Sequence, residues 1–522
     1  MINQKYLIGL LGILAFFSLA TLSFNALQPD DASMYALTIK NTVLHNQWLM
    51  PLLQPGDPAS FLDKPLLGIW LQAIPLMFLK WIGIRVPASE ISVHIPNVLY
   101  YLLLLYVFYF FLKKQKDDEF ALVGTFVLAT TLAVFVYSRT PKLDILLTLA
   151  ITLAQFYLYR FWKDQKNWKL LCFWVAVGFL IKSGFALIFC GLTFLSLFLI
   201  DRDFRDKFLK FLFQKEFYVG AAYFLLPVVI LMGLPYFAAP TQYGSYLKSV
   251  LWQSKYNTSY LGLGMHGTIL GYVILAFFPW TVFLFNKNLY SFQNLVKKKN
   301  SLEFFSLIWF ISNILFLFFF YRQNDLRTFV SLMPPLAILV SGSLIQPATK
   351  KIGVACAALF FSFLLLTQIP QILNSSALIP VVLWVGFLLI VAFYSFNPKK
   401  YFLYAALAAL VAGYIGLLFS AGTIVRNSNP YMTWQKKLET RFYNKIDFYI
   451  YRPVGRPLFM SHDQAYLDFV SGPADRYITD AHFLDKKTNY FLLTDPSSLK
   501  LLKLPIHEIL FTDPYSVLVW VK

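Results

Sequence analysis

The sequence predicts an all-α polytopic membrane protein with a small α/β domain at its C-terminal end. Two observations support this fold class. Of the 522 residues, 58% are hydrophobic and only 14% are charged, and the mean hydropathy of +0.60 is far above that of a soluble globular domain. The apolar residues also form runs long enough to cross a bilayer, and short clusters of Lys and Arg separate these runs.

The basic clusters explain the net charge of +19 without a nucleic-acid partner. They lie between apolar runs, in stretches such as KKQKDDE and DRDFRDK, which is typical of cytoplasmic loops under the positive-inside rule. We therefore expect no nucleic-acid binding. The cysteines predict neither a disulfide framework nor a zinc site, because Cys172, Cys190 and Cys356 lie within apolar segments and lack metal-type spacing.

The predicted spans are apolar runs of about 20 residues. The first run, residues 7–27, has some features of a signal peptide, but no clear small-x-small cleavage site accompanies it and many further spans follow. We interpret it as a retained first helix. The others bring the total to about thirteen: residues 93–112, 120–137, 143–161, 168–182, 184–200, 217–236, 267–286, 303–321, 326–345, 351–369, 374–396 and 401–421.

Residues 65–84 are also apolar enough to span the membrane, but the charge pattern argues against it. With Lys5 on the cytoplasmic side, the later basic clusters share that side only if residues 65–84 do not cross. We therefore predict an outer juxtamembrane or re-entrant helix there, within a first outer loop of residues 28–92. The N-terminus is then cytoplasmic, and the odd number of spans places the C-terminal end outside.

The chain divides into two predicted domains, a transmembrane domain of residues 1–424 and a second domain of residues 425–522. In the second domain, polar residues interleave with β-type runs such as FYIY, YFLLT and VLVWV. This pattern predicts a small α/β domain on the extracytoplasmic side.

Several basic residues fall on the predicted outer side, where the positive-inside rule disfavours them. Each lies beside the outer end of a span, and together they predict a positive rim around a cavity at the membrane surface. A phosphate or pyrophosphate of a lipid carrier would suit such a rim, whereas the alternative is that the side chains only snorkel to the headgroups. The residues are Lys64, Arg139, Lys142, Lys182, Arg322 and Arg327.

Acidic residues on the same side are candidates for chemistry, because a carboxylate beside phosphate-binding cations can accept a proton from an attacking hydroxyl. Asp31 and Asp144 are the candidates. Helix capping is the alternative for Asp144 and the favoured role for Asp30. His266, at the end of a long outer loop, is either an interfacial residue at a helix start or a ligand of a metal or phosphate.

Two stretches of the first outer loop form a recognisable pattern, DASMYALTIKNTVLHNQWLMPLL and then LDKPLLGIWLQA. They resemble the C-type membrane glycosyltransferases (GT-C fold) that use polyprenyl-phosphate sugars, above all the lipid A aminoarabinose transferases and the bacterial relatives of the protein O-mannosyltransferases. There the loop reads Asp-Glu-x-x-Tyr-Ala, then Gly-x-Trp-x-x-Pro, then acidic-Lys-Pro-Pro-Leu-Gly-Tyr-Trp. The matching residues, in the same order and at near-equal spacing, are Asp31, Tyr35, Trp48, Pro51, Asp63, Lys64, Pro65, Gly68 and Trp70.

The resemblance continues to about residue 345. KLDILLTLA is similar to the second-loop Asp motif, IKSGFAL to a Lys-Gly-Pro turn, GMHGTILGYVILAFFPW to the His element and LRTFVSLMPPLAIL to the late basic helix. Ala32, Met34, Leu66, Ser183 and Phe185 depart from the family pattern. These departures weaken the transfer of a sugar or an acceptor from any one subfamily.

The resemblance implies that a sugar moves from a polyprenyl-phosphate carrier to an acceptor at the outer side of the cell (inner) membrane, with inversion at the anomeric carbon. The acceptor stays open between lipid A, another glycolipid or polysaccharide, and a protein hydroxyl. The phosphate leaves as a stable anion that positive groups stabilise, so no general acid is obligatory. We expect no required cofactor. The implied donor-phosphate ligands are Lys64, Lys182, Arg322 and Arg327.

The remaining implied roles concern the acceptor and a metal ion. Asp31 is the carboxylate nearest the reacting centre, as general base or acceptor-orienting group, and Asp144 is second. Asp30, Tyr35 and Trp48 contact substrate. If a divalent ion assists, its ligands are Asp63 and His266.

Two other classes of function compete with a transferase. A transporter or flippase of a lipid-linked or anionic solute would also need basic residues, but it typically shows symmetric repeats and charges near the middle of the membrane. A non-catalytic assembly or receptor protein would leave the outer acid–base cluster without a purpose. The convergence of Asp31, Lys64, Asp144 and Arg327 in one cavity would favour the transferase.

Overall fold

In the computed structural model, helices make up most of the part of the chain that is described. The predicted spans 351–369, 374–396 and 401–421 lie outside that part, as do Asp30, Asp63 and Arg322. The described residues are 31–53, 61, 64–83, 90–251, 266–278, 280–285, 301–320 and 326–344, together with parts of 8–19 and of 447–521.

Four helices in the described part are long and apolar enough to cross a membrane. They lie in α4 (Glu90–Gln115), α7 (Asp144–Asp164), α11 (Lys215–Gly233) with its extension α12 (Pro235–Ala238), and α16 (Leu302–Phe320). A fifth candidate is the pair α9 (Phe185–Ile200) and α10 (Arg202–Phe211), which is bent by 114°. The predicted total of about thirteen stays a prediction.

Two predicted spans are divided in the structure. Residues 120–137 form α5 (Asp118–Ala129) and α6 (Leu132–Tyr137). At the break, the hydroxyls of Thr130 and Thr131 donate to backbone oxygens of the preceding turn, at 2.7 Å each, and the Leu132 backbone N–H donates to Phe278 instead of continuing the helix. Threonine hydroxyls that bond back to the helix compete with regular helical hydrogen bonding.

The second divided span is residues 267–286. It contains α14 (His266–Ala276) and the 3₁₀ helix η5 (Trp280–Phe285). Pro279 lies between them in the sequence, and proline has no backbone N–H to continue an α-helix.

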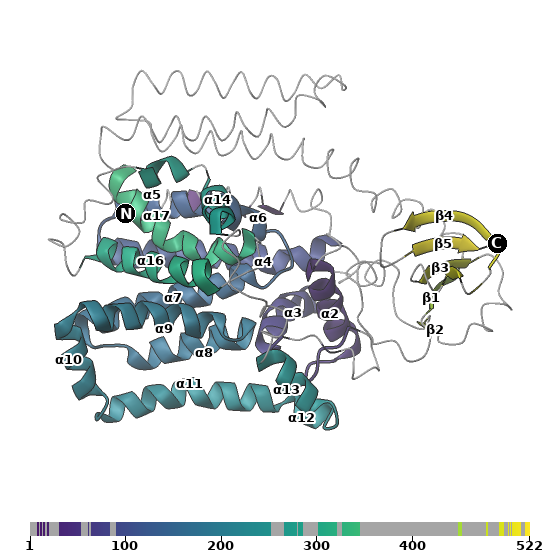
Figure 1. Ribbon diagram of the computed structural model, residues 1–522, viewed down its shortest axis with the longest axis horizontal. Helices are drawn as coiled ribbons and strands as arrows, with labels where there is room; N and C mark the ends of the chain where they lie inside the picture. Colours follow the sequence, from purple (N-terminus) through teal and green to yellow (C-terminus); the bar gives the residue numbers. More distant parts are fainter. Residues whose placement is uncertain are drawn as a thin grey trace, which may run out of the picture.

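The helices α7, α8 (Trp168–Lys182), α9 and α11 lie side by side (Figure 1), and α4 also packs on α7. Helix α17 (Met333–Leu344) packs on α5 and α16. Small residues permit this close packing. A methyl group added at Gly178 of α8 would come within 2.4 Å of the Ala186 Cβ on α9. Close approach at small residues is a general feature of packed membrane helices.

Four short elements gather at the right-hand end of the bundle in Figure 1: α2 (Asp31–His45), α3 (Leu66–Trp81), α12 and α13 (Tyr243–Leu251). Helix α3 rises only about 24 Å, compared with about 30 Å for a bilayer's hydrocarbon core. It also exposes Ile74, Met77, Phe78 and Trp81. The outer juxtamembrane position of this helix stays a prediction.

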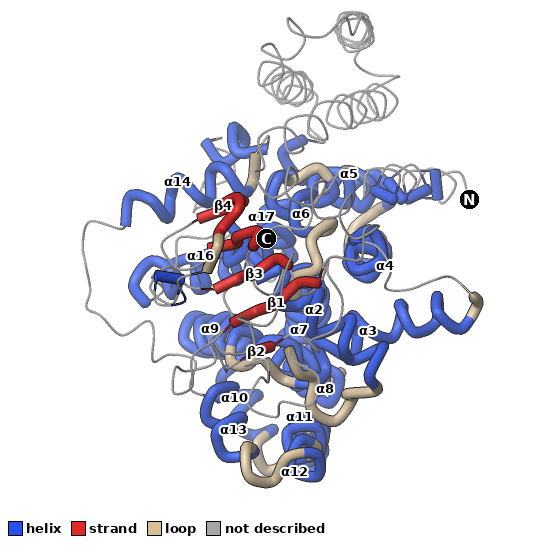
Figure 2. The backbone as a smooth tube through the Cα atoms, turned by 90° about the vertical axis from the view of Figure 1, so that its right-hand side faces the viewer, coloured by secondary structure: helices blue, strands red, loops and turns tan. Residues whose placement is uncertain are grey.

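Strands form one five-stranded sheet within residues 447–521, in the order β2-β1-β3-β5-β4. Strand β1 is parallel to β2 and β3, whereas β5 is antiparallel to β3 and β4. Figure 2 shows the sheet in front of the helices. The bounds of the α/β domain and its side of the membrane stay predictions. The strands are β1 Asp447–Tyr451, β2 Tyr477–Ile478, β3 Tyr490–Thr494, β4 Ile506–Thr512 and β5 Val517–Val521.

Candidate active site

Two ion pairs lie at the end of the bundle where α2 and α3 gather. The Lys182 Nζ lies 2.6 Å from Asp144 Oδ1, and the two side chains are 15% and 6% exposed. The Arg327 guanidinium pairs with the Asp31 carboxylate. The Arg327 side chain is 17% exposed and the Asp31 side chain is 34% exposed. These pairs connect α8 to α7 and the 3₁₀ helix η6 (Leu326–Leu332) to α2.

The start of α7 positions Asp144 for its ion pair. Asp144 is the first helical residue, and the N-cap residue Leu143 makes no side-chain capping bond. The Asp144 carboxylate instead accepts from Lys182, the last residue of α8. The alternative in which Asp144 serves as the helix cap is therefore not what the structure shows.

The two ion pairs belong to one cluster. One turn beyond Asp144, the Thr148 hydroxyl lies 3.0 Å from the Ser331 hydroxyl of η6, the helix that carries Arg327. The positive charges of Arg327 and Lys64 both act on the Lys182 ammonium. The cluster of Lys64, Lys182, Arg327, Asp31 and Asp144 thus contains three cations and two carboxylates, and its net positive charge favours a bound anion.

Lys64 reaches this cluster because α3 approaches α8 closely. A Cβ added at Gly68 would lie 2.8 Å from the Ile181 carbonyl oxygen and 2.9 Å from the Leu143 side chain. Ile181 and Leu143 directly precede the two members of the Lys182–Asp144 pair. Gly68 therefore permits the first turn of α3 to pack against the residues that position this pair.

Helix α13 supports the same segment from the other side. The Tyr246 hydroxyl donates to the Lys64 carbonyl oxygen at 3.3 Å, and its ring meets Phe61 edge-on, with centroids 5.8 Å apart. Burial raises the pKa of the Tyr246 hydroxyl above its usual value. Tyr246 is therefore a neutral hydrogen-bond donor, and sequence reasoning did not identify it.

A buried polar clamp holds the loop before Asp144. The carbonyl oxygen of Arg139 lies 2.6 Å from His94 Nδ1, so this ring nitrogen carries the hydrogen. The Asn97 side chain donates to the carbonyls of Lys142, at 2.7 Å, and of Thr140. Gln72 of α3 donates to Asn97 at 2.7 Å. Sequence reasoning missed these residues, and their one signal is a polar side chain within an apolar run.

Side chains of α2 and α3 hold the predicted first outer loop. The Trp70 indole donates to the Trp48 carbonyl oxygen at 2.7 Å, and Asn41 donates to the Leu53 carbonyl oxygen at 2.8 Å. Trp48 is half-buried, whereas Tyr35 is only 3% exposed and lies in the core under α2. Substrate contacts of Tyr35, Trp48 and Asp30 stay predictions.

The structure thus brings together five of the predicted site residues, namely Asp31, Lys64, Asp144, Lys182 and Arg327. His266 begins α14, a helix that packs on η6 through the stacked rings of Tyr272 and Phe329. The His266 side chain, Asp30, Asp63 and Arg322 lie outside what the structure describes.

The metal prediction rests on residues that the structure leaves untested. Among the described residues, no group of three or more His, Cys, Asp or Glu side chains is arranged to hold a metal ion. The predicted ligands, Asp63 and the His266 side chain, are not among those residues. We derive no step of the reaction from a metal ion.

A family model and several solved structures match this chain. The family model, described as dolichyl-phosphate-mannose-protein mannosyltransferase, matches residues 63–232. This range includes Lys64, Asp144 and Lys182. No curated protein sequence matches the chain.

Two of the solved structures are of ArnT from Cupriavidus metallidurans. The apo structure has a TM-score of 0.75 and 14% sequence identity, over 100% of this chain and 98% of that chain. The structure bound to undecaprenyl phosphate has a TM-score of 0.72 and 15% identity, over 98% of this chain and 97% of that chain. The chain has the fold of these structures, which confirms its resemblance to the C-type membrane glycosyltransferases.

Proposed function

We propose that this protein transfers a sugar from a polyprenyl-phosphate carrier to an acceptor at the outer side of the inner membrane. The observation that carries the proposal is the cluster in which Lys64, Lys182 and Arg327 meet Asp31 and Asp144 at one end of the bundle. Its net positive charge suits a phosphate, and its carboxylates suit proton transfer from an acceptor hydroxyl. The fold shared with ArnT supports the same class of reaction.

The cations of the cluster stabilise the leaving group. When the bond between the anomeric carbon and the phosphate oxygen breaks, negative charge grows on the phosphate. Lys64, Lys182 and Arg327 offset that charge at a partly buried site, where electrostatic interactions are stronger than in water. Asp144 holds the Lys182 ammonium in place at 2.6 Å, so no large rearrangement of that cation is needed during the reaction.

The two carboxylates differ in exposure, which suggests different roles. The Asp31 side chain is 34% exposed, whereas that of Asp144 is 6% exposed. An acceptor hydroxyl can therefore approach Asp31 more easily, and Asp31 then accepts its proton or orients it for attack. Attack from the side opposite the departing phosphate inverts the anomeric carbon. Asp144 acts mainly through Lys182.

The relatives suggest the donor class but leave the acceptor open. One ArnT structure contains undecaprenyl phosphate, and the family model names dolichyl-phosphate-mannose and protein. We infer a polyprenyl-phosphate-linked sugar as donor, and lipid A, another glycolipid or a protein hydroxyl as acceptor. Asp30, Tyr35, Trp48 and Arg322 remain proposed substrate contacts. Asp63 and His266 are the proposed ligands should a divalent ion take part.

Mass spectrometry of envelope lipids and glycoproteins from a deletion strain tests the proposal. A modification that is lost on deletion should return with the wild-type gene and stay absent with the Asp31→Asn variant, because an amide cannot accept the proton. The Asp206→Asn variant is the matched control, since Asp206 is exposed on α10, away from the cluster.

Two results would contradict the proposal. One is full restoration by Asp31→Asn at a normal protein level. The other is an unchanged envelope in the deletion strain together with movement of a lipid-linked sugar by the purified protein, which would favour the flippase alternative.

A further inference from the structure

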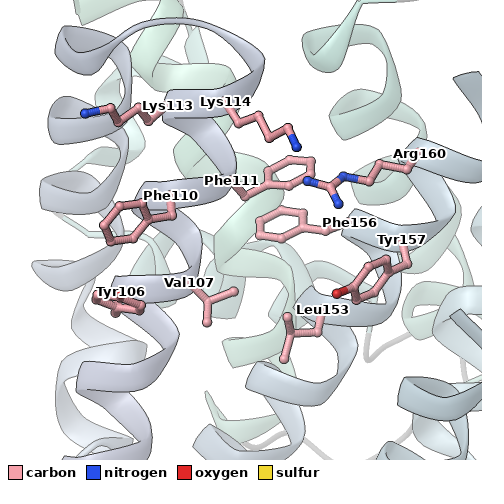
Figure 3. A pocket seen from close by; sticks show the side chains of 10 residues that line it. All are labelled: Tyr106, Val107, Phe110, Phe111, Lys113, Lys114, Leu153, Phe156, Tyr157 and Arg160. Carbon is pink, nitrogen blue, oxygen red and sulfur yellow. The ribbon is translucent and has the colours of Figure 1, made fainter. Parts of the chain in front are cut away.

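A cavity lies between α4 and α7, near the ends of these helices that are farthest from the candidate active site. Its volume is about 620 Å³. Phe111 and Phe156 form its floor, Val107 and Leu153 line its wall, and Lys114 and Arg160 form its rim (Figure 3). Nothing in the proposed transfer reaction uses these residues.

Helix geometry places this rim at the opposite surface of the membrane. From His94, which holds the active-site loop, α4 rises about 30 Å to Lys114, and from Asp144 α7 rises about 24 Å to Arg160. The α4 rise matches the hydrocarbon thickness of a bilayer, about 30 Å, and the long Arg160 side chain can reach the same level from the shorter α7 rise. The rim therefore lies at the level of the lipid headgroups in the leaflet opposite the active site.

The floor of the cavity suits an apolar chain. The Phe111 and Phe156 rings are stacked, with centroids 3.6 Å apart and planes 5° apart, and the two residues are 7% and 4% exposed. Stacked rings with aliphatic neighbours offer no hydrogen-bonding group to a polar ligand. A hydrocarbon chain loses nothing by lying against such a surface.

The rim suits an anion. Lys114 and Arg160 reach toward one another above the floor, whereas Lys113 points away (Figure 3) and pairs with Asp118 at 2.8 Å. Among the residues that the structure describes, neither Lys114 nor Arg160 makes an ion pair. Two like charges that face each other across a cavity repel one another, and an anion between them turns this repulsion into two attractions.

We propose that this cavity binds an anionic glycerophospholipid of the leaflet opposite the active site. The lipid phosphate lies between Lys114 and Arg160, and an acyl chain lies along Val107 and Leu153 against the Phe111–Phe156 floor. Basic pockets between transmembrane helices are known to bind anionic headgroups. Since α4 and α7 also carry the active-site loop and Asp144, the bound lipid contacts both helices that support the cluster.

Native mass spectrometry of the purified full chain, titrated with phosphatidylglycerol or phosphatidylcholine, tests this site. Wild-type protein should bind phosphatidylglycerol more tightly than phosphatidylcholine. The variant Lys114→Gln/Arg160→Gln should bind phosphatidylglycerol roughly thirtyfold more weakly. Each substitution removes one attraction to the anionic headgroup, and the two losses of affinity multiply. The control Lys163→Gln/Lys169→Gln removes two exposed cations of α7 and α8 that do not line the cavity and should keep the wild-type affinity.

A second variant tests the apolar part of the site. Leu153→Trp fills the cavity and leaves both rim charges in place, so it should also weaken phosphatidylglycerol binding, with thermal melting as the check on folding. Glycerol 3-phosphate, the soluble headgroup, should not displace the lipid at equal concentration.

Three results would overturn the site. Equal losses in the rim and control variants would indicate general surface charge. Wild-type affinity in a folded Leu153→Trp protein would place the lipid elsewhere. Displacement by glycerol 3-phosphate at equal concentration would indicate a site for free phosphate esters.

Discussion

The two ends of α4 and α7 both gather cations, but they hold them in different ways. At the active-site end, Lys182 is paired with a carboxylate that is 6% exposed, and buried side chains hold the loop before that carboxylate. At the other end, Lys114 is exposed, and the Lys113–Asp118 pair is about one third exposed, with side chains at 32% and 29%. The first group is therefore held by buried contacts, whereas the second is held by fewer and more exposed contacts.

This difference suggests how the molecule separates two tasks. A reaction needs charges at fixed positions, because misplaced charges lose most of their effect on the transition state. Attraction of a lipid headgroup needs only charges that can reach it. The following experiments measure the contrast, from the largest expected effect to the smallest.

Removal of the buried carboxylate should have the largest effect. The variant Asp144→Asn leaves the Lys182 charge without its partner and should lower the free energy of unfolding by about 3–5 kcal/mol. The double variant Asp144→Asn/Lys182→Met removes the uncompensated charge and should recover much of that stability, but not sugar transfer. SDS-induced unfolding in detergent measures both. A double variant no more stable than Asp144→Asn would show that the buried charge is not the cause.

The close approach of α3 to α8 should have an intermediate effect. Gly68→Ala places a methyl group against the Ile181 carbonyl oxygen and should cost about 1–3 kcal/mol of unfolding free energy, together with reduced sugar transfer. The matched control is Gly191→Ala in α9, where nothing lies within 4 Å of an added Cβ. That control should be neutral or slightly stabilising. Equal melting temperatures for the two variants would show that α3 can shift without loss.

The same carboxylate-to-amide change at the other end should have the smallest effect. Asp118→Asn removes the partner of Lys113 and should lower the unfolding free energy by about 0–1 kcal/mol. High salt screens the ion pair, so this difference between wild type and variant should become smaller there. Sugar transfer should be unchanged. A loss as large as that of Asp144→Asn would remove the contrast between the two ends.

Much of the fold and part of the site could be predicted from local sequence. Apolar runs predicted α4, α7, α8, α9 and α16, since hydropathy is averaged over a window and depends only on neighbouring residues. The same average could not show the break between α5 and α6, because threonine fits an apolar run while its hydroxyl competes for backbone oxygens.

The pairing within the site was beyond local sequence. Asp31 and Arg327 are 296 residues apart, and Asp144 and Lys182 are 38 apart. Charge position relative to the predicted membrane surface indicated that these residues share one side. Only the packing of α2, α7, α8 and η6 shows which cation meets which carboxylate. His94 and Asn97 were missed because their role lies in the backbone carbonyl groups they bind, and a sequence does not show where backbone groups meet. Gln72 was missed because it acts through the Asn97 side chain.

Helix α7 is buried along most of its length, and its first and last turns serve the two ends compared above. A helix packed on all sides neither stretches nor tilts freely. The distance along α7 from Asp144 to Arg160 therefore sets the bilayer thickness that fits this protein best. A bilayer much thinner or thicker than this has to deform around the protein, and the free-energy cost rises with each ångström of mismatch. We therefore expect the length of α7 to determine in which membranes this protein is most stable.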